Sequence, residues 1–94
     1  MNLHLNEQER IVYADGEPQH LTNHEYGILS VLMAHPDCVM TSEQIYREVW
    51  TQEPFDCRNT IYVHMRHLRI KIEQNPNCPK HLLKAWGKGY LYHP

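Results

Sequence analysis

Short stretches in which apolar and polar residues alternate open the chain and predict strands. Residues 3–5 alternate in this way, and residues 10–13 are rich in β-prone side chains. Asp15-Gly16 is a preferred pair for a two-residue hairpin turn, because glycine tolerates a positive φ. The returning segment 17–21 contains a proline and is expected to pair only as an edge strand. A small antiparallel sheet is therefore predicted at the N-terminus.

Two helices are predicted next, each opened by a capping box and followed by apolar residues at helical spacing. Thr22 and Glu25 form the first box, and His35-Pro36-Asp37 ends that helix. Residues 39–40 can add one short extended piece, after which residues 41–44 form the second box. The apolar sides of the two helices are expected to be Tyr26, Leu29, Leu32, Met33, Ile45, Val49 and Trp50.

A third helix is predicted over residues 57–74, before Asn75-Pro76. Its apolar positions repeat at four, three and four residues and form one core-facing stripe: Ile61, Met65, Leu68 and Ile72. The other side carries Arg58, Asn59, Thr60, Val63, Arg66, His67 and Arg69. Residues 82–92 then predict a β-hairpin with a basic Gly-Lys-Gly tip. The expected fold is an α+β winged helix with its core on the apolar sides of the three helices.

Charge is divided unevenly along the chain. The net charge is −2, but residues 1–57 hold ten acids and two arginines, 2 − 10 = −8. Residues 58–94 hold seven Lys or Arg and one Glu, 7 − 1 = +6. The division predicts one basic surface built from the C-terminal third, where a basic helix after a short loop suits docking in the DNA major groove.

Composition and motifs argue against several other classes. The longest apolar run, residues 31–34, is far shorter than the roughly 20 residues of a membrane span. Three cysteines without a CxxC pair fit a reducing, cytoplasmic compartment and not a disulfide framework. His64 and His67 lack an accompanying cysteine pair, so neither a metal nor another cofactor is expected. No phosphate loop or nucleophile elbow is present, and an enzyme is not expected.

The four segments that carry these features resemble one known family in order and spacing. They are Leu21-Thr22-x-x-Glu25-Tyr26-x-x-Leu29, residues 41–45 with Val49-Trp50, residues 60–69, and Gly87-Lys88-Gly89-Tyr90. Together they resemble the winged-helix effector domain of OmpR/PhoB-type response regulators, over nearly the whole chain 1–94. The resemblance implies transcription regulation through sequence-specific binding of double-stranded DNA.

The resemblance also implies a location for each part of the DNA-binding surface. The third helix would enter the major groove with Arg58, Asn59, Thr60, Val63, His64, Arg66, His67 and Arg69. The hairpin would form a wing on the adjacent backbone or minor groove, with Lys84, Trp86 and Lys88. This chain has His67 and Trp86 where the family often has arginine. We therefore expect the wing to hold phosphates through Lys84 and Lys88, and the sequence leaves open whether it also reads the minor groove.

Further partners are implied by the resemblance alone. The loop between the second and third helices would contact RNA polymerase through Thr51, Gln52, Glu53, Pro54 and Phe55. Two protomers would bind DNA head to tail. A receiver domain, which responds to a sensor kinase, is absent from these 94 residues.

Two other interpretations stay open at this stage. The chain is either an excised or stand-alone domain, or the DNA-binding head of a membrane-tethered activator. A winged-helix module for protein interaction is the rival function, because arginine is missing at positions 67 and 86 and the N-terminal half is acidic. A DNA interface is favoured by the run of Arg58, Arg66, Arg69 and Lys71, which contains no acid.

Overall fold

The N-terminal sheet has the three strands that the alternation predicts. The computed structural model describes residues 2–94. In it β1 (Leu3–Asn6), β2 (Ile11–Ala14) and β3 (Glu17–His20) pair antiparallel in that order, with Leu5 opposite Val12. Both turn residues between β2 and β3, Asp15 and Gly16, have positive φ values of 51° and 86°. This is the backbone that the Asp-Gly pair favours in a two-residue hairpin.

Three helices follow, and the first two begin at the predicted caps. Helix α1 (Asn23–Ala34) is capped by Thr22 and α2 (Ser42–Trp50) by Thr41, with both hydrogen bonds of each capping box present. Helix α3 (Arg58–Ile72) begins after Cys57 without a side-chain cap. It ends two residues earlier than predicted, because the backbone of Glu73 is extended, with φ −83° and ψ 141°.

The wing is the hairpin of β4 (Leu82–Ala85) and β5 (Gly89–Tyr92). A single bridge joins it to the segment before α2, where Met40 pairs antiparallel with Tyr90. The two backbones approach so closely at this bridge that a Cβ on Gly89 would lie 2.0 Å from the Met40 carbonyl oxygen. Glycine at position 89 thus allows the wing to dock against the helices.

The core is wider than the three helical stripes that the sequence predicts. Ile28 in α1 and the four predicted α3 residues are buried, but so are Val12 and Leu21 from the N-terminal segment. The wing contributes Leu82, Tyr90 and Tyr92. The prediction that Tyr26, Val49 and Trp50 form the core is corrected here, since all three are only partly buried at its margin. In α1 the buried positions are 25, 28, 29 and 32, so the helix turns Tyr26 toward the edge.

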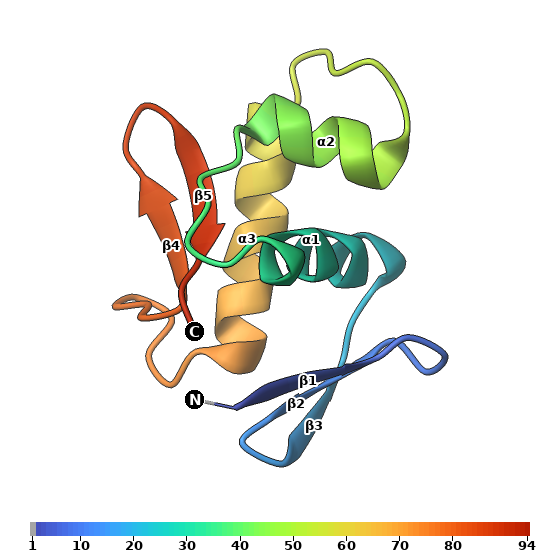
Figure 1. Ribbon diagram of the computed structural model, residues 1–94, viewed down its shortest axis with the longest axis vertical. Helices are drawn as coiled ribbons and strands as arrows, with labels where there is room; N and C mark the ends of the chain where they lie inside the picture. Colours follow the sequence, from blue (N-terminus) through green and yellow to red (C-terminus); the bar gives the residue numbers. More distant parts are fainter. Residues whose placement is uncertain (1) are drawn as a thin grey trace.

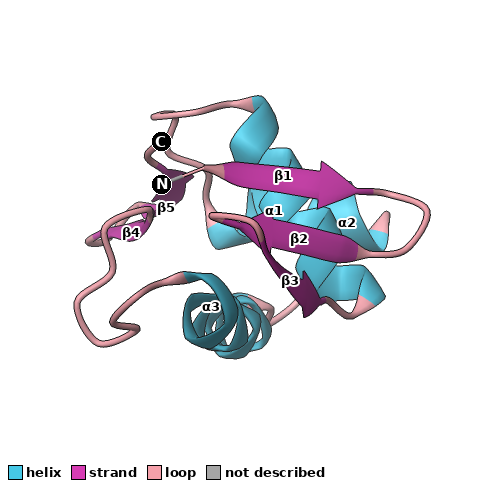
Figure 2. Cartoon of the chain, turned by 90° about the horizontal axis from the view of Figure 1, so that it is seen from below, coloured by secondary structure: helices cyan, strands magenta, loops and turns pink. Residues whose placement is uncertain are grey.

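The elements enclose α3 on three sides. In Figure 1, α3 runs between the wing and the α1–α2 pair, and its C-terminal end lies near the N-terminal sheet. Figure 2 views α3 almost end-on and shows that the sheet packs over the α1 side of the molecule. One face of α3 is consequently left for solvent. None of the helices in residues 2–94 has the length and apolarity needed to cross a membrane.

Candidate nucleic-acid interface

The exposed face of α3 lies opposite its buried stripe. Ile61, Met65, Leu68 and Ile72 point into the core. Of the predicted α3 residues, Arg58, Asn59, Val63, Arg66 and His67 are exposed, and Thr60, His64 and Arg69 are half-buried. The helix therefore presents five of its eight candidate residues to solvent.

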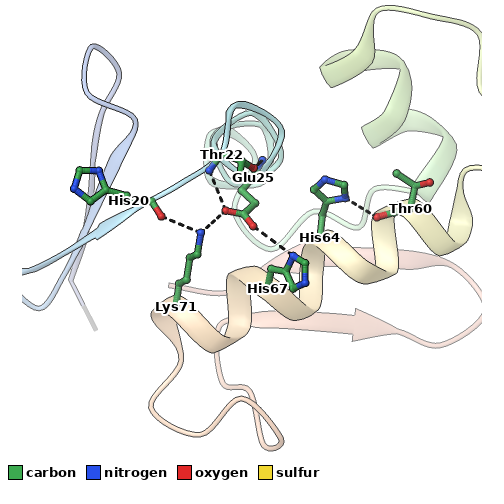
Figure 3. A network of polar contacts seen from close by, with 7 residues as sticks. All are labelled: His20, Thr22, Glu25, Thr60, His64, His67 and Lys71. Carbon is green, nitrogen blue, oxygen red and sulfur yellow. Dashed lines mark hydrogen bonds and ion pairs between the residues drawn. The ribbon is translucent and has the colours of Figure 1, made fainter.

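A polar network fixes the side of α3 that faces α1. Figure 3 shows it, with the buried carboxylate of Glu25 at its centre. One carboxylate oxygen accepts hydrogen bonds from the Lys71 ammonium at 2.6 Å and from the Thr22 amide at 3.0 Å. The other lies 3.6 Å from Nδ1 of His67. Lys71 also donates to the carbonyl of His20 at 2.9 Å, so its charge is held inside the fold.

The environment of Glu25 keeps its carboxyl group ionised. Burial by itself raises the pKa of this group. The hydrogen bonds from Lys71 and from the Thr22 amide, with the positive charges of Lys71 and His67, outweigh burial and lower the pKa below its ordinary value. An ionised Glu25 thus attracts His67 toward α1 whenever the imidazole is protonated.

His64 is packed against α1 and α2. Its Nδ1 lies 2.7 Å from the carbonyl oxygen of Thr60 and must donate to it, because a carbonyl only accepts. The imidazole meets the Trp50 ring edge-on, with centroids 5.4 Å apart. His24 and Tyr46 stack on the same indole at 4.2 Å and 4.7 Å. These contacts fix the orientation of His64 beside the exposed face.

Two of the predicted arginines are bound within the domain. Arg58 Nε lies 3.3 Å from the Glu43 carboxylate, which joins the start of α3 to the start of α2. Arg69 Nε donates to the Leu82 carbonyl at 3.0 Å, and its guanidinium lies over the Tyr90 ring. Arg69 therefore connects α3 to the wing.

The wing extends beyond the body of the domain. Trp86 is 84% exposed, and the Lys84 ammonium lies 4.6 Å from the centre of its ring. Lys88 is exposed at the turn. A hollow of about 360 Å³ separates the wing from the start of α3, lined by Arg58, Asn59 and Tyr62 on one side and by Lys84 and Lys88 on the other.

The loop between α2 and α3 is open to solvent. Thr51, Gln52, Glu53 and Phe55 are exposed, and Pro54 is half-buried. Glu53 approaches Arg47 of α2 at 3.7 Å. Phe55 is 91% exposed, which leaves a complete aromatic ring in water.

The seven basic residues of positions 58–94 thus fall into two groups. Within residues 2–94, Arg58, Arg69 and Lys71 are engaged in the contacts described above. The side chains of Arg66, Lys80, Lys84 and Lys88 make no hydrogen bond or ion pair there. Arg69 and Lys71 therefore add less to the basic surface than the charge of the segment suggests, whereas the Arg58 side chain remains 84% exposed. No group of three or more His, Cys, Asp or Glu in the described part of the chain is arranged to hold a metal ion.

Comparison with known proteins identifies the family. The family model described as "Transcriptional regulatory protein, C terminal" matches residues 16–92. The chain belongs to the OmpR/PhoB-type family of regulatory C-terminal domains.

A relative supports this membership, and two solved structures share the fold. This chain is 48% identical over 79 residues to the transcriptional regulatory protein YcbL of Bacillus subtilis. The aligned residues cover 84% of this chain and 35% of YcbL. It superposes on DrrB, an OmpR/PhoB homologue of Thermotoga maritima, with a TM-score of 0.85 and 24% identity, over 100% of this chain and 42% of DrrB. The DNA-binding domain of Klebsiella pneumoniae RstA, crystallised with the RstA box, gives 0.84 at 22% identity, over 97% and 90% of the two chains.

The environments of four side chains of this OmpR/PhoB-type domain are not revealed by the sequence patterns. Tyr62 and Ile70 are 42% and 61% exposed on α3, although their apolar character suggests no surface role. Glu25 is predicted only as part of a capping box. Glu73 is buried and accepts from the amides of Lys80, His81 and Leu82 at 2.7–3.0 Å. Its isolation as the one acid among residues 58–94 is the signal that the sequence offers.

Proposed function

We propose that this domain binds double-stranded DNA through α3 and the wing, and regulates transcription as the output domain of a two-component-type response regulator. The observation that carries the proposal is the hollow between the two elements. It is lined by α3 residues and by Lys84 and Lys88 of the wing, so both elements face the same partner. Regular spacing of charge along a duplex lets one helix and one hairpin bind it together.

The charge and shape of this face suit a duplex. The B-DNA major groove is about 12 Å wide and admits one α-helix. Arg66 on α3 and Lys84 and Lys88 on the wing make no hydrogen bond or ion pair within residues 2–94 and can neutralise phosphates. The RstA domain, which shares the fold, is described in complex with the RstA box, and this supports the same use here.

The remaining assignments follow from membership of the family. The chain spans 35% of YcbL, so the activity and partners of a whole regulator are proposals for it. We infer that residues 1–94 form one effector domain of a cytoplasmic protein, attached to a receiver domain under a sensor kinase. Two copies bind head to tail on DNA, the exposed loop 51–55 contacts RNA polymerase, and the domain catalyses no reaction.

The test measures binding of a generic labelled duplex by fluorescence anisotropy across a salt series. The affinity should fall linearly with salt on logarithmic axes. Replacing Arg66 and Lys84 by Ala should weaken binding and reduce the slope by about one for each phosphate that is no longer neutralised. Lys80→Ala is the matched control, because Lys80 lines a different hollow between the N-terminal sheet and the end of α3. An equal effect of all three changes would contradict the proposed face.

A protein-interaction module is the second candidate. Phe55 and Trp86 are the most exposed large apolar side chains among the described residues, at 91% and 84%. Aromatic side chains of this kind are enriched at protein interfaces. Absence of duplex binding even at low salt, by a chain that remains folded in circular dichroism, would favour this second function.

A further inference from the structure

The part of α3 directly opposite the core holds a small set of side chains. Successive residues of an α-helix are about 100° apart around its axis. Asn59, Val63 and Ile70 therefore lie on the side of α3 opposite its buried residues. Asn59 and Val63 are four residues apart and lie on adjacent turns. Ile70 is two turns beyond Val63, where it lines a hollow with Pro76 and Pro79 of the loop that follows α3. Asn59 and Val63 are therefore the outermost pair near the N-terminal end of the helix.

Neighbouring polar side chains are directed elsewhere. Thr60 is half-buried, so its side chain is less accessible than that of Asn59. His67 leans toward Glu25, and Arg58 is bound to Glu43. In residues 2–94 the Asn59 amide makes no hydrogen bond. It is also the one carboxamide on α3, so both its donor and its acceptor are available to a ligand.

The chemistry of the two side chains selects one kind of base pair. A carboxamide can bond N6 and N7 of adenine together in the major groove, and an apolar side chain packs on the 5-methyl group of thymine. Val63 is 38% exposed, so part of its apolar side chain is accessible to a ligand. The rise between the two residues is about 6 Å, which corresponds to about two base-pair steps.

We propose that Asn59 and Val63 are the base-reading residues of this domain and that they recognise A·T pairs about two steps apart in the major groove. The inference rests on the proposed DNA-binding function. Asn59 bonds adenine and Val63 contacts a thymine methyl group. Arg66, on the side of α3 that lines a hollow with Tyr62 and Arg69, binds a phosphate. His67 lies on the opposite flank, with Nδ1 3.6 Å from the Glu25 carboxylate.

The first experiment selects duplexes from a random library with this 94-residue chain and measures the preferred site by anisotropy. If the chain selects duplexes with a common sequence, the proposed DNA-binding function is supported. If it binds no duplex, that function is refuted, and the inference falls with it. The selected site should contain two A·T pairs about two steps apart. A site that is fixed only at G·C pairs would overturn the inference.

The second experiment is a double-substitution cycle on that site. Val63→Ala should weaken binding of the thymine duplex about fourfold, as expected for removal of methyl contacts. It should have no effect when the contacted thymine is replaced by uracil, which lacks the methyl group. Asn59→Ala should cost at least about fivefold on adenine and a smaller factor when that adenine is replaced by 7-deazaadenine, which keeps the N6 donor but lacks the N7 acceptor.

The control variants are His67→Ala and Thr60→Ala. Each should change affinity by the same factor on the natural and modified duplexes, because neither residue reads these atoms. If His67→Ala shows the coupling to uracil or 7-deazaadenine and Asn59→Ala and Val63→Ala do not, the assignment of the reading face is wrong. Circular dichroism of each variant separates loss of reading from loss of fold.

Discussion

Single side chains in this domain serve several elements at once. The carboxylate of Glu25 completes the cap of α1, holds Lys71 at the end of α3 and attracts His67 on its exposed side. The Glu25 carboxylate is buried, so loss of its negative charge would leave the Lys71 ammonium without an ionic partner. Glu25 therefore affects both the stability of the domain and the position of an α3 side chain.

Glu25→Gln should destabilise the domain by about 1–3 kcal/mol at neutral pH, because hydrogen bonds to charged groups contribute about that much. Glutamine can still complete a capping box, so the change isolates the charge. The folded-state pKa of Glu25 lies below the ordinary value of 4.5, so folding favours the carboxylate. Its contribution is complete above the unfolded pKa and is lost as the pH falls through the folded pKa.

Urea denaturation of both proteins between about pH 5 and about pH 3 measures this difference. The gap between wild type and Glu25→Gln should narrow as the pH falls. A gap that is constant over this interval would show that the charge of Glu25 does not stabilise the fold.

The three thiols should differ sharply in reactivity. Cys38 and Cys78 are exposed, whereas Cys57 is 2% exposed at the start of α3. Burial, and then the negative charge of Glu43, raise the pKa of the Cys57 thiol above its ordinary value. Since the thiolate is the reactive form, a disulfide reagent should label two cysteines rapidly and Cys57 only after unfolding. Rapid labelling of all three cysteines in the native protein would contradict this expectation. The control variant Cys57→Ala should still show two rapidly labelled cysteines.

The elements themselves were predictable wherever their signals are local. The Asp15-Gly16 turn and the caps at Thr22 and Thr41 depend on residues within three positions of one another, and the structure confirms all of them. Long-range contacts carry no such signal. The pairing of Glu25 with Lys71 joins positions 46 residues apart and turns one predicted surface cation inward. Burial of Tyr90 and Tyr92 likewise depends on how the wing packs against the helices.

The register of α3 can be tested by two neighbouring substitutions. Leu68 is fully buried and Ile70 is 61% exposed. Leu68→Ala should cost about 2–5 kcal/mol, because it leaves a cavity in the core. Ile70→Ala should stay within about 0.5 kcal/mol, as is usual for surface positions. Chemical denaturation measures both, and similar losses for the two variants would place the helix in the wrong register.

Docking of the wing depends on the glycine at position 89. Gly89→Ala should cost about 3 kcal/mol or more, because the new Cβ would overlap the Met40 carbonyl at 2.0 Å. Gly87→Ala is the matched control in the same turn. Gly87 has φ +73°, and a Cβ added there would meet no neighbouring group within 4 Å. Only backbone strain of about 1–2 kcal/mol is therefore expected. Equal losses in thermal denaturation would show that backbone strain, and not the close approach to Met40, determines the effect.

At the scale of the whole molecule, the acidic turn between β1 and β2 and the basic wing lie on different sides of the domain. The domain measures 36 × 29 × 21 Å, and the turn between β1 and β2 lies on the side away from the wing (Figure 1). Glu7 and Glu9 are exposed in that turn. Charges farther apart than a Debye length, about 8 Å at physiological salt and about 30 Å at 0.01 M, are largely screened from each other.

Glu7→Gln with Glu9→Gln should therefore change duplex affinity in a salt-dependent way. At about 0.01 M salt the double variant should bind more tightly than wild type, because two negative charges no longer repel the phosphates. At about 0.15 M the two proteins should bind equally, as measured by anisotropy. Tighter binding at both salt concentrations would mean that the β1–β2 turn lies against the DNA.

Glu73 gives the wing an attachment that is independent of the loop before it. Its carboxylate accepts hydrogen bonds from the backbone amides of residues 80, 81 and 82, at the start of β4. The orientation of the wing relative to α3 is thereby set at a fixed anchor, whatever path residues 74–79 take. This loop is thus a suitable site for a peptide insertion or for the new ends of a circular permutant, since such changes leave both binding elements in place.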